Sequence, residues 1–134
     1  MKKIYIAGFD VFEPDSIEIG KKFVKLCEEY GFIGLYPLDN VIDFNQEKNK
    51  IAQDIYKANV NLINQCDIVI ANINAFRGKE ADSGTIWECG YARALDKRVF
   101  GYRKKEQNYI DTFSKDETKL LNDVIVDLDN RFIE

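Results

Sequence analysis

The most informative absence in the sequence is histidine, because none of the 134 residues is one. Triads and dyads that use an imidazole as the base, and metal sites with histidine ligands, are therefore excluded within this chain. Cysteine is scarce, with Cys27, Cys66 and Cys89 scattered and no CxxC spacing. This predicts no metal site and no disulfide framework, and is typical of a reducing cytoplasm. Any acid–base or nucleophilic chemistry must then use carboxylates, tyrosines, lysines or a cysteine.

Positive charge, long apolar runs and nucleotide-binding loops are also missing. The chain has 23 acidic and 19 basic residues and a net charge of −4, which argues against a nucleic-acid polymer as partner. No apolar run is long enough to span a membrane, and residues 1–8 are too short for a secretory signal, so we expect a cytoplasmic protein. Neither a Walker loop nor a GxGxxG fingerprint occurs, so no cofactor is predicted.

What the chain does contain is enough apolar material for one core. Hydrophobic residues make up 46% of the sequence, and its length suits a single domain over residues 1–134. Apolar runs predict strands at 4–8, 32–36, 67–73 and 97–102, and helical spacing predicts helices at 17–30, 48–65 and 82–94. The alternation predicts an α/β fold, with a three-layer, flavodoxin/Rossmann-like parallel sheet of four to five strands and helices on both faces. The fifth would be an edge strand at 124–126. Ligands of such sheets bind beyond the carboxyl ends of the strands.

Residues 82–92, DSGTIWECGYA, open a helix at that edge and hold the strongest chemical signal. Asp82 lies at the cap and Glu88 about a turn and a half into the helix. Gly84 lets a ligand approach the backbone, and Gly90 is expected to let another element pack closely. Cys89 is interpreted as a small apolar filler. Asp82 as a simple N-cap and Glu88 as a solvated residue remain an equal alternative on these residues alone.

The same segment resembles the signature of the nucleoside 2-deoxyribosyltransferase family, a D-x-G-T/L-x-x-E-x-G-Y-A pattern. Residues 4–8 (IYIAG) resemble the opening strand of that family, residues 66–71 (CDIVIA) its third strand, and residues 94–99 (ALDKRV) the stretch that leads into its fourth. The likeness covers residues about 3 to 102 in the right order and spacing. It implies an enzyme of nucleotide salvage that takes 2′-deoxynucleosides and free nucleobases.

The resemblance also implies catalytic roles. Glu88 would be the nucleophile at C1′ of the deoxyribose, Asp82 would share the pocket, and Tyr5 would hold the glutamate. A covalent deoxyribosyl-glutamate would form and then be released by a second base. Asp82 would move the proton of the base nitrogen, which needs a carboxyl pKa raised by a water-poor pocket. The remaining candidates for substrate binding are Gly8, Phe9, Phe12, Ser83 and Gly84.

Two departures from the family pattern concern substrate binding. Asn59 stands where relatives often carry an acidic residue that contacts the base, and an amide cannot shuttle a proton. Family members complete each pocket with a C-terminal Asn or Asp from a neighbouring subunit. Asn130 or Asp129 is the candidate for that role, and a shared site implies a homo-oligomer, at least a dimer.

Three other interpretations compete with transfer. A relative that hydrolyses 2′-deoxynucleoside 5′-monophosphates needs a phosphate site, which Asp10, Glu13 and Asp15 disfavour, although Ser16 at a helix N-terminus remains. A non-catalytic nucleotide-sensing module would tolerate the loss of Glu88. A receiver-like domain needs an acidic cluster with a phosphoacceptor, and the residues after Ile73 do not supply one.

Overall fold

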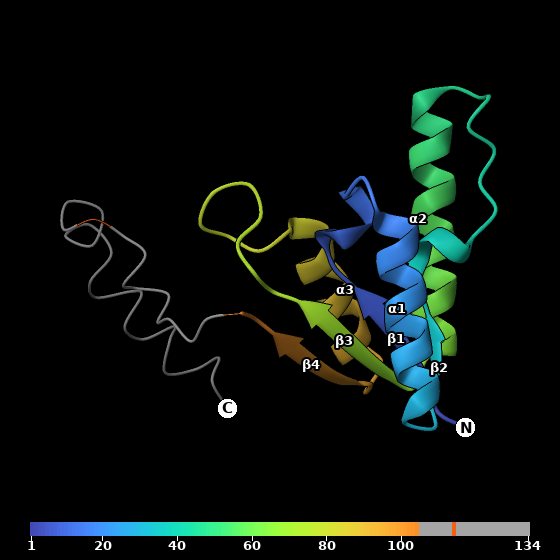
Figure 1. Cartoon of the computed structure of the whole chain (residues 1–134). Helices are drawn as coiled ribbons and strands as arrows, with labels where there is room; N and C mark the ends of the chain where they lie inside the picture. Colours follow the sequence, from blue (N-terminus) through green and yellow to red (C-terminus); the bar gives the residue numbers. More distant parts are fainter. Residues whose placement is uncertain (105–113, 115–134) are drawn as a thin grey trace. The chain divides into compact units, whose positions relative to one another are not determined.

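The computed structural model describes residues 1–104 and residue 114, and these form an alternating α/β chain (Figure 1). Its regular elements are β1 (Lys3–Ala7), α1 (Ser16–Glu29), β2 (Ile33–Leu35), α2 (Lys48–Gln65), β3 (Ile68–Asn72), α3 (Ser83–Ala94) and β4 (Arg98–Tyr102). Short 3-10 helices follow the first two strands, η1 (Phe9–Phe12) and η2 (Pro37–Asp39). All the strands and helices predicted for this part of the chain are present.

The four strands form one parallel sheet in the order β2-β1-β3-β4. In its register Tyr5 lies opposite Leu35 of β2 and Val69 of β3. The chain order reverses between β1 and β3, because β2 was added on one side of β1 and β3 on the other. A crevice opens at such a switch point, beyond the carboxyl ends of the two strands.

Helices cover both faces of the sheet, which confirms the predicted three-layer α/β architecture. Successive residues of β1 point to opposite faces. Ile4 and Ile6 pack with the apolar residues of α1, whereas Tyr5 and Ala7 pack with Ile63 of α2 and with α3 on the other face. The side chain of Tyr5 is fully buried. A tyrosine hydroxyl is thereby placed under the helices of the second face.

Local chemistry explains where the helices begin and end. Gly31 has a positive φ of 78°, the left-handed conformation that commonly follows a helix and that glycine adopts without strain. The predicted cap Asp82 accepts a hydrogen bond from the backbone N–H of Thr85, 2.9 Å away. No helix was predicted between the strand at 4–8 and the helix at 17–30, but residues Phe9–Phe12 form η1 there. A single 3-10 turn has no apolar periodicity that a sequence pattern would reveal.

The described elements belong to one compact unit, Met1–Arg103. The edge strand expected at 124–126 and the candidates Asp129 and Asn130 lie outside the described residues, so they stay predictions, as does the single domain over 1–134. Among the described residues, no helix is long and apolar enough to cross a membrane.

Candidate active site

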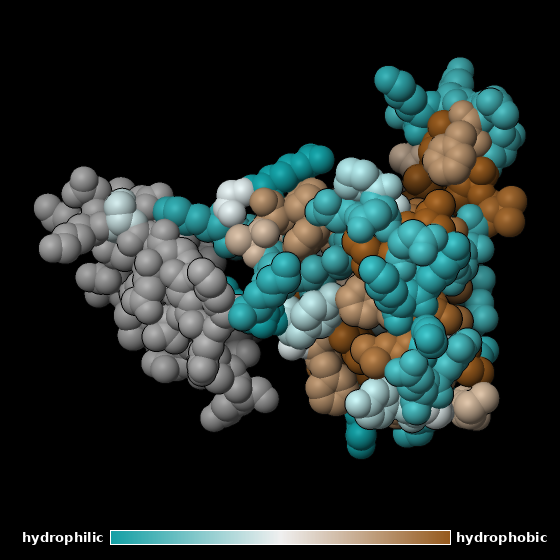
Figure 2. Space-filling view, in the orientation of Figure 1, coloured by the Kyte–Doolittle hydropathy of each residue, from teal (hydrophilic) through white to brown (hydrophobic). Residues whose placement is uncertain are grey.

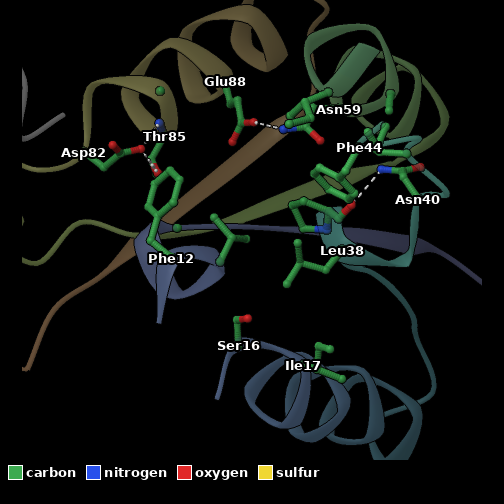
Figure 3. Close-up of a pocket in the computed structure, with 17 residues that line it drawn as sticks. Phe12, Ser16, Ile17, Leu38, Asn40, Phe44, Asn59, Asp82, Thr85 and Glu88 are labelled. Atoms are coloured by element: carbon green, nitrogen blue, oxygen red, sulfur yellow. Dashed lines mark hydrogen bonds between the residues drawn. The ribbon is translucent and has the colours of Figure 1, made fainter. Parts of the chain in front are cut away.

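Glu88 lies on α3 and faces the crevice beyond β1 and β3. Its carboxylate accepts two hydrogen bonds on one oxygen, Oε1: the Tyr5 hydroxyl donates at 2.8 Å and Asn59 Nδ2 donates at 3.1 Å. The two donors come from β1 and α2, so three elements meet at this one atom. Figure 3 shows Glu88 and Asn59 facing each other across the gap between α3 and α2. The other oxygen, Oε2, receives no hydrogen bond from any described residue.

The surroundings of Glu88 oppose its ionisation in part. Burial raises the pKa of Glu88, the hydrogen bonds from Tyr5 and Asn59 lower it, and the nearby charge of Asp82 raises it. The Glu88 carboxylate is therefore short of solvent and fixed at one oxygen, while its other oxygen has no described donor.

Tyr5 is a permanent donor at this site. Burial, followed by the charge of Glu88, raises the pKa of Tyr5 far above its ordinary value. The phenol therefore keeps its proton at every working pH. Its hydrogen-bond partner in the structure is Glu88, 83 positions away in the sequence, as the family resemblance implied.

Asp82 is both the N-cap of α3 and a residue of the cavity wall. Its Oδ2 caps α3 by accepting from the backbone N–H and from the hydroxyl of Thr85, both at 2.9 Å. Its side chain also lines the cavity that contains Glu88. The two carboxylates thus share one enclosure, with Thr85 buried beneath the cap.

The cavity has a volume of about 600 Å³, which is within the range of small-molecule sites. Of the predicted substrate-binding residues, Gly8, Phe12, Asn59 and Gly84 line it, together with Asp82 and Glu88. Phe9 and Ser83 do not line it. Phe9 instead stacks on Phe76, with ring centroids 5.0 Å apart.

The outer wall of the cavity is apolar, and it was not predicted from the sequence. It is built by Val11, Ile17, Pro37, Leu38, Ile42, Phe44, Ile55 and Ala58. Figure 2 shows hydrophobic side chains gathered at the base of the projecting N-terminal half of α2. The sequence contains part of the pattern that predicts this wall, because Ile55, Ala58 and Asn59 share one helical face. In the structure that face borders the cavity, and the loop before α2, whose role was not predicted, completes the wall.

Two contacts join the loops that flank the cavity. The Asn72 side chain at the end of β3 donates from Nδ2 to Asp10 in η1, at 2.9 Å. Phe12 of η1 stacks on Phe76 of the loop after β3, with centroids 5.7 Å apart. Gly8 permits this arrangement, because a Cβ there would lie 2.6 Å from Asp10 Oδ2 and 2.8 Å from Asn72 Cβ. Phe12 is thereby held in the wall of the cavity that Asp82 and Thr85 also line (Figure 3).

The outer face of α3 carries a row of aromatic rings away from the carboxylate. Trp87 stacks on Tyr91 at 5.3 Å with an interplanar angle of 7°, and Tyr56 of α2 lies 5.4 Å from the same indole. Trp87 remains 45% exposed.

Two further expectations for α3 concern small residues. A Cβ built on Gly90 meets no atom of another described element within 4 Å, so none of the described elements supplies the close packing expected at this glycine. Burial and the charge of Glu88 raise the pKa of the Cys89 thiol to about 11, so it stays protonated, as suits a filler.

Comparisons with known proteins agree with this geometry. A family model for nucleoside 2-deoxyribosyltransferase matches residues 4–130. The structure is similar to a 2-deoxyribosyltransferase from Leishmania mexicana, with 31% identity and a TM-score of 0.68, over 84% of this chain and 71% of that one. It shares its fold with a 2-deoxyribosyltransferase from Bacillus psychrosaccharolyticus, with 23% identity and a TM-score of 0.60, over 81% and 78% of the two chains.

A curated relative extends further than this chain. An uncharacterized protein from Schizosaccharomyces pombe is 28% identical over 109 residues, which is 79% of this chain. The chain spans about half (52%) of the length of that relative. The family match over most of the sequence carries the assignment, and the chain belongs to the nucleoside 2-deoxyribosyltransferase family.

Proposed function

We propose that this protein transfers 2-deoxyribose between nucleobases, with Glu88 as the nucleophile. The observation that carries the proposal is the state of the Glu88 carboxylate: Oε1 is held by Tyr5 and Asn59, and Oε2 has no described partner beside a cavity of nucleoside size. A group fixed in this way reacts with little reorganisation.

The proposed reaction has two displacement steps at C1′. Oε2 of Glu88 forms a bond to C1′ while the bond from C1′ to the base nitrogen breaks, and the departing base takes the electron pair. Asp82 gives that nitrogen a proton through the oxygen not engaged in capping. A second base then attacks C1′ with its nitrogen lone pair, returns a proton to Asp82, and releases the Glu88 carboxylate.

The described cavity fits an unphosphorylated substrate better than a monophosphate. Asp82 and Glu88 line it, and no lysine or arginine is among the described lining residues. A phosphate dianion needs cationic or backbone N–H partners to replace its hydration. The one feature that favours hydrolysis of 5′-monophosphates is Ser16, which lines the cavity at the N-terminal end of α1. This makes the hydrolase the second candidate.

Base exchange tests the proposal directly. The wild type and Glu88→Ala are incubated with adenine and, in turn, deoxyinosine, thymidine or deoxycytidine, and the products are separated by chromatography. Deoxyadenosine made by the wild type and not by the variant supports transfer. Free base without deoxyadenosine points to hydrolysis, and the 5′-monophosphates are then assayed. Binding without turnover in both proteins refutes the enzyme and leaves the sensing module.

Oligomerisation and location are part of the same proposal. A neighbouring subunit would complete the site through Asn130 or Asp129, in a cytoplasmic homo-oligomer. Sedimentation of the intact chain, with exchange assays of Asn130→Ala and Asp129→Ala, tests the shared site.

A further inference from the structure

The helices α1 and α3 cover opposite faces of the sheet and present different surfaces to solvent. The outer surface of α1 is charged, as is usual for a surface helix, with Glu18, Lys21, Lys22, Lys25, Glu28 and Glu29 all exposed. The exposed residues of α3 are Ser83, Gly84, Ile86, Trp87, Gly90, Arg93 and Ala94. Arg93 is the one charged residue among them. The outer surface of α3 is therefore largely apolar.

The inner side of α3 is apolar as well, since Ala92 is buried and both Cys89 and Tyr91 pack against the core. A helix that is apolar all round is typical of a helix that is buried all round. In the described part of this chain, however, α3 is covered on its sheet side and along α2, and Ile86 and Trp87 remain about half exposed. This helix has the composition of one that is covered on its outer side too.

Tyr56 of α2 extends the apolar surface beyond α3. It is exposed, and its ring lies 5.4 Å from Trp87, which stacks on Tyr91. Tryptophan, tyrosine and arginine are the residue types most enriched where proteins contact one another, and they carry much of the binding energy there. The exposed residues of α3, together with Tyr56 and Tyr91, are called the α3 face below. Its composition is that of a protein–protein contact.

The two ends of the α3 face carry opposite charges. Glu80 and Asp82 stand at its N-terminal end, and Arg93 lies in the last turn. A surface of this kind is complementary to a second copy of itself. When the copy is turned about a two-fold axis so that the two helices run antiparallel, each Arg93 comes to the acidic end of the other helix. Opposite ends of the helix dipoles then also meet.

We propose that the α3 face is the contact surface between two copies of this chain. The apolar middle of the face, at Ile86 and Trp87, holds no acidic residue, so two chains of net charge −4 can approach each other there. The inference rests on the homo-oligomer proposed above and not on the transfer reaction. The helix that carries Glu88 is then held by the core on one side and by the partner subunit on the other.

Ile86→Lys tests the contact by sedimentation. Ile86 is 51% exposed in the single chain, so the lysine is solvated in a monomer, but in the antiparallel pair it is buried close to an arginine. We expect the dissociation constant to rise at least about a hundredfold. Leu26→Lys is the matched control, because Leu26 is 49% exposed on α1, and its dissociation constant should stay within about twofold of the wild type. Thermal unfolding checks that both variants fold.

The charged ends of the face are tested separately. Arg93→Glu places like charges at both ends of the antiparallel pair, so the dissociation constant should rise about fivefold at low ionic strength and less in high salt. Lys22→Glu changes the net charge equally but lies on α1, and it should leave the dissociation constant near that of the wild type. An unchanged dissociation constant in Arg93→Glu at low salt overturns the antiparallel arrangement.

The single tryptophan of the chain, Trp87, reports on the contact itself. Its emission should move to longer wavelength when the wild type is diluted, in step with the dissociation seen by sedimentation, because the indole passes from a buried contact to water. Ile86→Lys should show the emission of the diluted wild type at every concentration. An oligomer held by a different surface would dissociate without a change in this emission.

The outcomes separate this inference from the proposed reaction. A wild type that is a monomer at high micromolar concentration, an Ile86→Lys variant that stays an oligomer, or an emission that does not follow dissociation overturns the α3 face as the contact. Base exchange by the wild type is assayed independently. A wild type that forms this contact and exchanges no base refutes the proposed reaction and supports the contact.

Discussion

Removal of one hydroxyl, in Tyr5→Phe, tests how Glu88 is kept ionised and aimed. The phenyl ring of the variant fills the same fully buried place in the core, so the packing is preserved and the hydrogen bond to Oε1 at 2.8 Å is lost. A hydrogen bond to a charged acceptor contributes about 1.5–3 kcal/mol, and about 1.4 kcal/mol is a factor of ten in rate. The complete contribution therefore corresponds to a loss of about tenfold to a hundredfold.

We expect the lower end of that range, because Asn59 still donates to the same oxygen. At neutral pH kcat/KM of Tyr5→Phe should fall about tenfold. The pH dependence gives a second and independent readout. The Tyr5 hydrogen bond lowers the pKa of Glu88, so its loss raises that pKa further above the ordinary value. Protonated Glu88 cannot attack, and the acidic limb of the profile must move to higher pH.

The assay is initial-rate base exchange from pH 4 to pH 9 for the wild type, Tyr5→Phe and a control. Tyr91→Phe is the matched control, since it removes a tyrosine hydroxyl that bonds Asn64 and does not touch Glu88. Its profile should overlay that of the wild type. An acidic limb in Tyr5→Phe that stays in place or moves to lower pH would refute the reasoning, whatever happens to the rate.

The remaining predictions concern stability. Glu88→Gln keeps an acceptor for both donors and removes a carboxyl whose pKa is raised by burial, so the folded wild type binds its proton more tightly than the unfolded chain does. At a pH above the folded pKa, ionised Glu88 therefore destabilises the fold by about 1.4 kcal/mol for each unit by which folding raises its pKa. At a pH below the unfolded pKa of about 4.3 this destabilisation is absent. Urea unfolding should find Glu88→Gln more stable than the wild type at pH 7 and equal to it below about pH 4; a less stable variant at pH 7 contradicts this. Gly20→Ala places a Cβ 2.3 Å from the Tyr36 ring and should lose about 1–3 kcal/mol, whereas Gly90→Ala meets no described atom within 4 Å and should gain about 1 kcal/mol of helix propensity. Thermal unfolding of the pair decides this, and shifts of the same sign would show that the space around the two glycines does not control the result.

The secondary structure could be predicted well because local chemistry determines most of it. The helix expected at 48–65 is found as Lys48–Gln65, since Ile51, Ile55 and Leu62 keep one apolar face throughout. Gly31 and Asp82 mark helix ends by mechanisms that act within a few residues. η1 was missed because four residues with a single turn carry no periodic signal.

The site could be predicted only in part because it depends on contacts between distant residues. Tyr5 and Glu88 are 83 positions apart, and no spacing rule joins them; the family resemblance did. Asn59 was expected only at the base, and its hydrogen bond to Glu88 became visible once the packing of α2 on α3 was known. The close neighbour expected at Gly90 is not found among the described elements for the same reason, since a glycine in a helix does not show by itself whether a neighbour is close.

The stack of Trp87 on Tyr91 gives this protein an optical property. The sequence contains a single tryptophan, so its emission has one source, and that source is adjacent in the chain to Glu88. Fluorescence excited at the indole therefore reports on the helix that carries Glu88 and on its contact with Tyr56 of α2, without a label. If the proposed transfer takes place, stopped-flow recordings with a deoxynucleoside alone, and then with an acceptor base added, time its two displacement steps separately.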